Sequence, residues 1–309
     1  MQALVDVIFP VFVVVGIGYM AVRIRFFDQS GVDMIMKFAQ FVAIPALLFR
    51  AVAYMDLGEH FRLPLIISFY TGAIAGFTVG FVGARFLFRR QWQDSVAIGF
   101  CCLFSNSVLL GLPITERAYG PDALQANFVI IAMHAPFAYF IGITVMEVVK
   151  AGRKPATEIA TTIFKAMFHN VLIVALAVGF VFNFMGLSMP KVVDDGLAML
   201  ATGGLPAALF ALGGVLAGYK IQGDWRVVVY IAAVSLMLHP LVVYAVGTIA
   251  ALDQASFRSA VITGAMAPGA NAYIFANMYG VAKRVAASAV LFATALSLVT
   301  VWIWLLILP

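Results

Sequence analysis

Two segments of the sequence place asparagine, glycine and proline close together inside apolar runs. In the first segment, Cys101 to Pro113, the residues of this kind and their polar neighbours are Ser105, Asn106, Ser107, Gly111 and Pro113. In the second segment, Gly264 to Tyr273, they are Pro268, Gly269, Asn271 and Tyr273. Proline removes a backbone donor and glycine leaves helical geometry easily, so both segments predict an interrupted helix. A helix that restarts after such a break presents unpaired N–H groups, which attract anions.

The composition places these segments in a membrane. Of 309 residues, 64% are hydrophobic and 11% are charged, and the mean hydropathy is +1.04. Soluble globular chains carry about a quarter charged residues. The composition therefore excludes a soluble enzyme, a nucleic-acid-binding domain, a disordered chain and a disulfide-rich secreted scaffold. Continuous apolar runs argue against a β-barrel, whose strands alternate apolar and polar residues.

Apolar runs interrupted by charge, proline and glycine predict an all-α membrane protein with ten spans. They are expected at residues 3–22, 33–54, 64–88, 94–118, 124–148, 166–186, 193–217, 227–250, 258–280 and 286–307. Most of the 19 Lys and Arg residues fall in the loops on one side of these spans. That side should face the cytoplasm. The prediction is a multi-pass protein of the cell inner (plasma) membrane with both termini outside.

The two halves of the chain share landmarks at nearly the same separation. Pro45–Phe49 corresponds to Pro206–Phe210, and Asp33 corresponds to Asp194. Tyr119-Gly120 corresponds likewise to Tyr279-Gly280. Residues 1–150 and 160–309 are therefore interpreted as two five-helix repeats. Because five is odd, the second repeat enters the membrane inverted, as in many secondary transporters.

The interrupted spans four and nine occupy matching positions in these repeats. If they cross near the bilayer centre, their free N–H groups, the amides of Asn106 and Asn271, and the hydroxyls of Ser105 and Ser107 form an anion cradle without lysine or arginine. The alternative is that Pro113 and Pro268 only kink their helices, as prolines often do in membrane spans.

At these residues the sequence resembles the auxin efflux carrier family, which includes plant carriers and bacterial organic-acid exporters. The resemblance lies in Asn106–Pro113 with Tyr119-Gly120, in Pro268–Ala276 with Tyr279-Gly280, and in Phe9–Phe49. It implies a fold with crossed, broken helices four and nine, like that of bile-acid symporters and sodium/proton antiporters. Plant members place a proline where this chain has Ala272, whereas in this chain Pro268 lies four residues earlier.

The resemblance also implies a mechanism and an assembly. Spans 1, 2, 6 and 7 would form a scaffold that makes a homodimer, and spans 3–5 and 8–10 would form a transport domain that moves as an elevator. A small organic anion would bind where spans four and nine cross. Mono- and dicarboxylates and auxin-like indole acids are all compatible with this expectation. No nucleic acid is expected as a partner, and membrane lipid surrounds the chain.

Other polar and small residues are weighed against ordinary structural roles. Glu116 and His134 are candidates for a proton or gating site, although a solvated helix end and a packing histidine are the simpler explanations. Cys101 and Cys102 are interpreted as packing residues. Gly72, Gly76 and Gly80 are four residues apart and predict a close helix contact.

Two rival functions remain open at this stage. A sodium-coupled symporter of the bile-acid type would need oxygen ligands that include carboxylates, but no acid lies between Arg258 and Gly280. An intramembrane enzyme would need a nucleophile with a base, paired aspartates or a metal cluster, and the scattered histidines offer no ligand spacing. A receptor is a further alternative. No phosphate-binding loop is present, so ATP is not expected to drive transport. No cofactor and no metal are expected.

Overall fold

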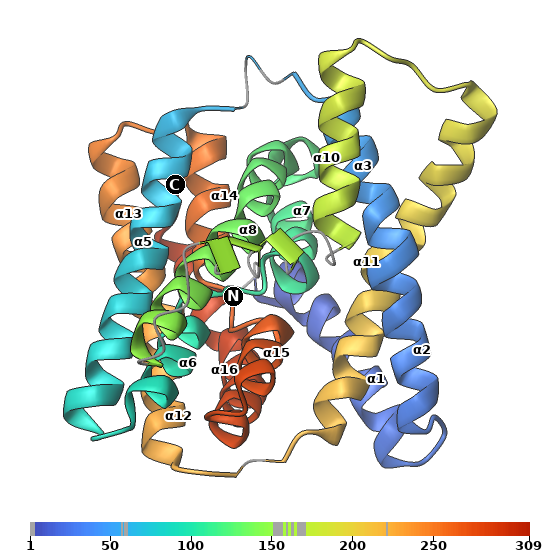
Figure 1. The fold of residues 1–309 in the computed structure, drawn as a ribbon. Helices are drawn as coiled ribbons and strands as arrows, with labels where there is room; N and C mark the ends of the chain where they lie inside the picture. The colour runs from blue at the N-terminus through green and yellow to red at the C-terminus, as the bar shows by residue number, and fades with distance from the viewer. Residues whose placement is uncertain are drawn as a thin grey trace.

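The computed structural model describes residues 4–56, 58, 61–150, 171–220 and 222–309, together with residues 157, 158, 160, 161, 164 and 165. Helices make up nearly all of the described chain (Figure 1). Within it, seven continuous helical stretches are long and apolar enough to cross a membrane: Val5–Arg23, Gln29–Ala53, Leu63–Leu87, Pro121–Val149, Lys191–Gly218, Trp225–Ile249 and Lys283–Ile307. Each coincides with a predicted span, because about 20 apolar residues suffice to cross the hydrocarbon.

The three remaining predicted spans are shorter or interrupted. The described part of span six is α10, Val171–Phe184. Span four consists of α6 (Trp92–Leu103), a π-helical turn (Ser107–Gly111) and α7 (Leu112–Tyr119). Span nine consists of α14 (Gln254–Gly264) and α15 (Ala270–Tyr279). The two interruptions predicted from the sequence are therefore confirmed.

One group of helices includes the long helix α11 (Lys191–Gly218), at the right of Figure 1. Its other members are α1 (Phe9–Arg23), α2 (Gln29–Phe38) and α3 (Ile44–Ala53), which pack on α11, and α10, which packs on α3. A π-helical turn at Ala39–Ala43 joins α2 to α3 in one continuous stretch. These elements come from predicted spans 1, 2, 6 and 7.

A second group of connected helices includes α5 (Leu63–Val82), at the left of Figure 1, which packs on α6 and α14. Besides α6, α14 and α15, its members are α12 (Trp225–Ala233), α13 (His239–Ile249) and α16 (Lys283–Ile307). The helix α8 (Leu124–Val149) packs mainly on α6 and α14 but also contacts α3 and α10. The site described below lies where the two groups meet.

Basic residues gather at one end of the molecule. The turns α1–α2, α5–α6, α11–α12 and α15–α16 all lie at the lower end in Figure 1. Among the residues in or beside these turns are Arg23, Arg25, Arg89, Arg90, Lys220, Arg226, Lys283 and Arg284. This is the end that the distribution of Lys and Arg predicts to be cytoplasmic.

Small residues bring neighbouring helices into backbone contact. On α5, a Cβ atom at Gly72 would meet His239 and Val243 of α13, and one at Gly76 would meet the carbonyl of Cys102. The predicted glycine face is thus confirmed, as is the role of the two cysteines, which are buried and unbonded to each other.

The tightest such contact joins α1 to α11. A Cβ atom at Gly18 would overlap the carbonyl oxygen of Phe210, and one at Gly213 would overlap that of Val15. Gly16 lies two residues before Gly18 on α1, and a Cβ atom at Gly16 would meet no other atom within 4 Å. The contact therefore depends on glycine at Gly18 and Gly213 but not at Gly16.

We predict that Gly18→Ala lowers the free energy of unfolding by about 1–3 kcal/mol, because the backbone of α11 must move away. The matched control Gly16→Ala should be neutral or slightly stabilising, since alanine favours the helix by up to about 1 kcal/mol over glycine. Thermal unfolding of the purified protein in detergent measures both. Equal midpoints for the two variants would contradict the close contact between α1 and α11.

Candidate functional site

The two broken spans pair with each other through their backbones. The amide of Asn106 donates to the carbonyl of Ala267 at 2.8 Å, and the amide of Gly269 donates to the carbonyl of Phe104 at 2.9 Å. Ser105 and Pro268 form an isolated antiparallel bridge between these bonds. Backbone groups left unpaired inside a membrane cost several kcal/mol each. Each break therefore supplies the partners that the other break needs.

The position of the break in span four differs in detail from the proline. The chain leaves the helix at Phe104, whereas Pro113 follows directly on the π-helical turn, inside the stretch that has already restarted at Ser107. In span nine Pro268 lies inside the break itself. The interruption of span four thus depends on pairing with span nine rather than on Pro113.

A cavity of about 60 Å³ lies beside this crossing. Both broken spans line it, since the residues around it include Phe104 to Leu109 and Gly269 to Asn271. The helix α8 contributes Ile131, His134 and Ala135. The helices of the other packing group close it with Gln40, Ile44, Leu172, Ile173 and Leu176. We call this space the crossover cavity.

The polar groups of the crossover cavity include an amide donor without a partner. The side-chain oxygen of Asn106 accepts from the amide of Leu109 at 3.3 Å, which caps the restarting helix. Its Nδ2 atom is buried and has no hydrogen-bond partner among the described residues. Asn106 as a whole is only 5% exposed. An NH₂ group held in this way is ready to donate to a bound acceptor.

A hydrogen bond from Tyr139 of α8 holds the side chain of Asn271. Its Oδ1 atom accepts from the hydroxyl of Tyr139 at 3.2 Å, which leaves its NH₂ group as the donor. The ring of Tyr139 packs on Phe100 and Phe104. Asn271 also lies in the first turn of α15, whose opening amides have no acceptor within the helix. The start of α15 therefore opens into the cavity with its positive dipole end.

The structure brings together five of the predicted binding residues and one candidate proton site. Those that line the crossover cavity are Ser105, Asn106, Ser107, Gly269, Asn271 and His134. Pro268 lies in the bridge but does not line the cavity. Gly111 lies in the π-helical turn, and Tyr273 packs on Tyr219 outside the cavity.

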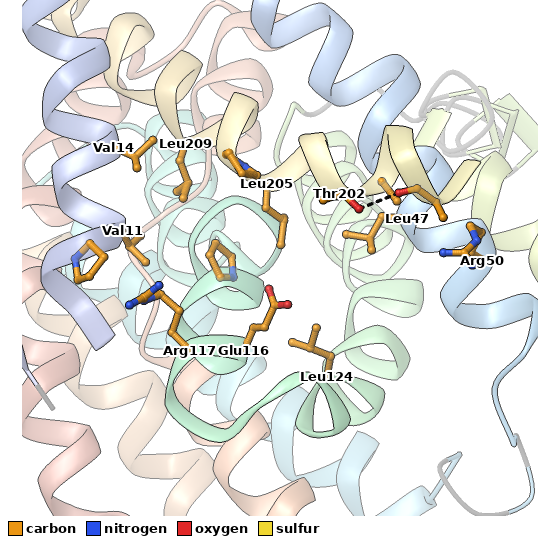
Figure 2. Close-up of a pocket in the computed structure, with 15 residues that line it drawn as sticks. Val11, Val14, Leu47, Arg50, Glu116, Arg117, Leu124, Thr202, Leu205 and Leu209 are labelled. Atoms are coloured by element: carbon orange, nitrogen blue, oxygen red, sulfur yellow. Dashed lines mark hydrogen bonds between the residues drawn. The ribbon is translucent and has the colours of Figure 1, made fainter. Parts of the chain in front are cut away.

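Pro113 and Glu116 line a second, larger cavity of about 470 Å³ (Figure 2). It lies between α7 on one side and α1, α3 and α11 on the other. Glu116 points into its centre, and Arg50 lies at its right edge in Figure 2. Arg50 is paired through two hydrogen bonds of 2.7 and 3.1 Å with Asp194. This cavity lies at part of the boundary between the two packing groups.

Sequence reasoning missed several residues that hold the site. Gln40 lines the cavity from the other packing group, and its polarity within an apolar run was a usable signal. Asn127 of α8 is fully buried and donates to the hydroxyls of Thr263 at 2.7 Å and Thr115 at 3.4 Å. It ties α14 and α7 together on one side of the crossing. Nothing in its sequence neighbourhood marks this contact.

A profile of membrane transport proteins matches residues 3–305 of the chain. The chain belongs to this family, that of the auxin efflux carriers. The family consists of transporters and not of enzymes, so the protein is a multi-pass membrane transporter. The resemblance noted from the sequence is thereby confirmed.

Relatives of this transporter cover nearly the whole chain at low identity. A protein of Rhizobium meliloti named "Putative malonate transporter" is 23% identical over 97% of this chain and 94% of its own length. Auxin efflux carrier component 5 of Arabidopsis thaliana is 20% identical over 95% of this chain and 93% of its own length. The uncharacterized transporter YfdV of Escherichia coli is 23% identical over 96% and 95%.

We predict that Tyr139→Phe lowers the free energy of unfolding by about 0.5–1.5 kcal/mol, because Asn271 loses the donor to its Oδ1 atom. Tyr244→Phe is the matched control, since its ring packs on Phe257 and Trp304 away from the crossing. Thermal unfolding in detergent measures both variants. Identical midpoints for Tyr139→Phe and the wild type would show that the hydroxyl does not hold Asn271.

Proposed function

We propose that this transporter exports a small organic anion, a carboxylate, which binds in the crossover cavity. One observation carries the proposal. The restarting helices of both broken spans open into the same small space, where the unpartnered amide of Asn106 and the amide of Asn271 add donors. No lysine or arginine is among the described residues that line this space. Donors without a fixed cation hold an anion firmly enough to select it and loosely enough to release it.

The packing of the helices supports an elevator mechanism. Spans 1, 2, 6 and 7 form one packing group and spans 3–5 and 8–10 form the other, with α8 at the boundary. We interpret the first as a scaffold and the second as a transport domain. The crossover cavity belongs mainly to the transport domain, so a movement of that domain would carry the anion. The larger cavity at the same boundary is interpreted as the aqueous vestibule on the outer side.

The proposed topology is ten spans in two inverted five-helix repeats, residues 1–150 and 160–309. The matching breaks in spans four and nine and the basic turns at one end support it. Inverted repeats allow the two halves to exchange conformations, which converts an outward-open state into an inward-open one. We further propose a homodimer formed through the scaffold, in the inner membrane of the cell.

The size of the cavity favours a short carboxylate. A site of about 60 Å³ holds on the order of two water molecules, since each takes up roughly 30 Å³ in the liquid. This space suits an acid of a few carbon atoms better than a fused indole ring. The name of the Rhizobium meliloti relative, which mentions malonate, agrees with this class. A short mono- or dicarboxylate is therefore the proposed substrate, and an auxin-like acid is the runner-up.

We predict that Asn106→Ala and Asn271→Ala each lower carboxylate transport by about 10- to 100-fold. A hydrogen bond to a charged group contributes about 1.5–3 kcal/mol, and each variant removes one or more such donors. The measurement is uptake of labelled malonate and acetate into proteoliposomes. Replacing sodium by choline in the same assay should leave transport unchanged, which separates this function from that of a sodium-coupled symporter.

Asn277→Ala is the matched control, because Asn277 is exposed on the same helix as Asn271. It should transport like the wild type. Thermal unfolding shows whether each variant is folded. Wild-type transport by a folded Asn106→Ala, Asn271→Ala double variant would rule out the crossover cavity as the anion site.

A further inference from the structure

The crossover cavity has few groups that could balance the charge of an anion. The starts of two helices offer about half an elementary charge each, and the amides of Asn106 and Asn271 are neutral. Among the described residues that line the cavity, His134 alone has a titratable side chain. A dicarboxylate with two negative charges would therefore leave part of its charge uncompensated in a region of low dielectric constant.

His134 is placed to respond to that charge. It is 2% exposed, and its Nε2 atom lies 3.4 Å from the hydroxyl oxygen of Ser105, at the break of span four. Its Nδ1 atom has no hydrogen-bond partner among the described residues. The imidazole ring packs against Phe104, with ring centres 4.7 Å apart. Ser105 and Phe104 belong to the segment that pairs with span nine, so the ring lies directly beside the crossing.

The other titratable groups near His134 face away from the cavity. Tyr70 of α5 has its ring centre 6.3 Å from that of His134, and its hydroxyl donates to the carbonyl of Ile130. His239 of α13 contacts Phe69, which also contacts His134, at 5.4 Å between ring centres in each case. Neither Tyr70 nor His239 lines the crossover cavity. His239 is thus a second buried histidine of the same kind outside the site.

We propose that His134 takes up one proton when the anion binds, so that the carboxylate and a proton move together. The proposal rests on the proposed function and names its coupling ion. The proton comes from water and adds to the ring nitrogen that lacks one. In the resulting imidazolium, Nε2 can donate to Ser105 and Nδ1 carries the second N–H. When the anion leaves, the proton returns to water.

The sign of the pH dependence follows from linkage. A nearby negative charge favours the protonated imidazole, so the bound protein holds more protons than the free protein. Affinity for the anion should therefore rise as the pH falls, by up to about tenfold per pH unit while the free protein is neutral at His134 and the bound protein is protonated.

The test is isothermal titration calorimetry of the purified, full-length protein with malonate, acetate, succinate and indole-3-acetate at pH 7.5. Each titration is repeated in buffers of different ionisation enthalpy, which gives the number of protons taken up per bound anion. For wild-type protein and a dicarboxylate we expect uptake of about one proton. His134→Gln should lose that uptake, and His239→Gln, the matched control, should keep it.

The outcomes distinguish this proposal from the proposed function. Binding of a carboxylate by the wild type without proton uptake, or equal uptake by folded His134→Gln, would overturn the role of His134 and leave the anion site intact. Failure of the wild type to bind any of the four acids would overturn the proposed function and this proposal with it. The wild-type titration needs no variant, so the test does not depend on whether His134→Gln folds.

Discussion

The whole arrangement depends on backbone hydrogen bonds between two interrupted helices. In hydrocarbon an unpaired backbone amide or carbonyl costs several kcal/mol, so neither break would be stable without the other. The bonds from Asn106 to Ala267 and from Gly269 to Phe104 solve this problem for both spans at once. They also fix where the two helices restart. Both restarting ends consequently line one shared cavity.

The surroundings of the crossing are built to keep these ends in place. Asn127 connects α8 to hydroxyls on α7 and α14, and Tyr139 connects α8 to Asn271 of α15. The helix α8 therefore holds parts of both broken spans through side-chain hydrogen bonds. The buried phenyl ring of Phe100 stacks on that of Phe275 with centres 4.0 Å apart and adds an apolar contact between α6 and α15. In the proposed elevator mechanism, this unit would move as one body.

The contacts inside the other group of helices differ from those at the boundary between the two groups. The contact between α1 and α11 at Gly18 and Gly213 is tight and purely backbone. By contrast, a cavity of about 470 Å³ lies between these helices and α7, and the acidic Glu116 points into it. Tight packing between α1 and α11 and a cavity over part of the boundary between the groups agree with relative motion of the two groups. The elevator mechanism proposed above is our interpretation of this difference in packing.

The sequence by itself determined the membrane class, the positions of the spans, the two interruptions and the family, because each depends on local hydrophobicity or on short motifs. It also marked Asn106 and Asn271. Only the tertiary structure decided that span four breaks at Phe104 rather than at Pro113, because that break is stabilised by pairing with a distant segment. It likewise decided that His134 lines the cavity while Glu116 does not, since which face of a helix meets the crossing depends on packing between spans.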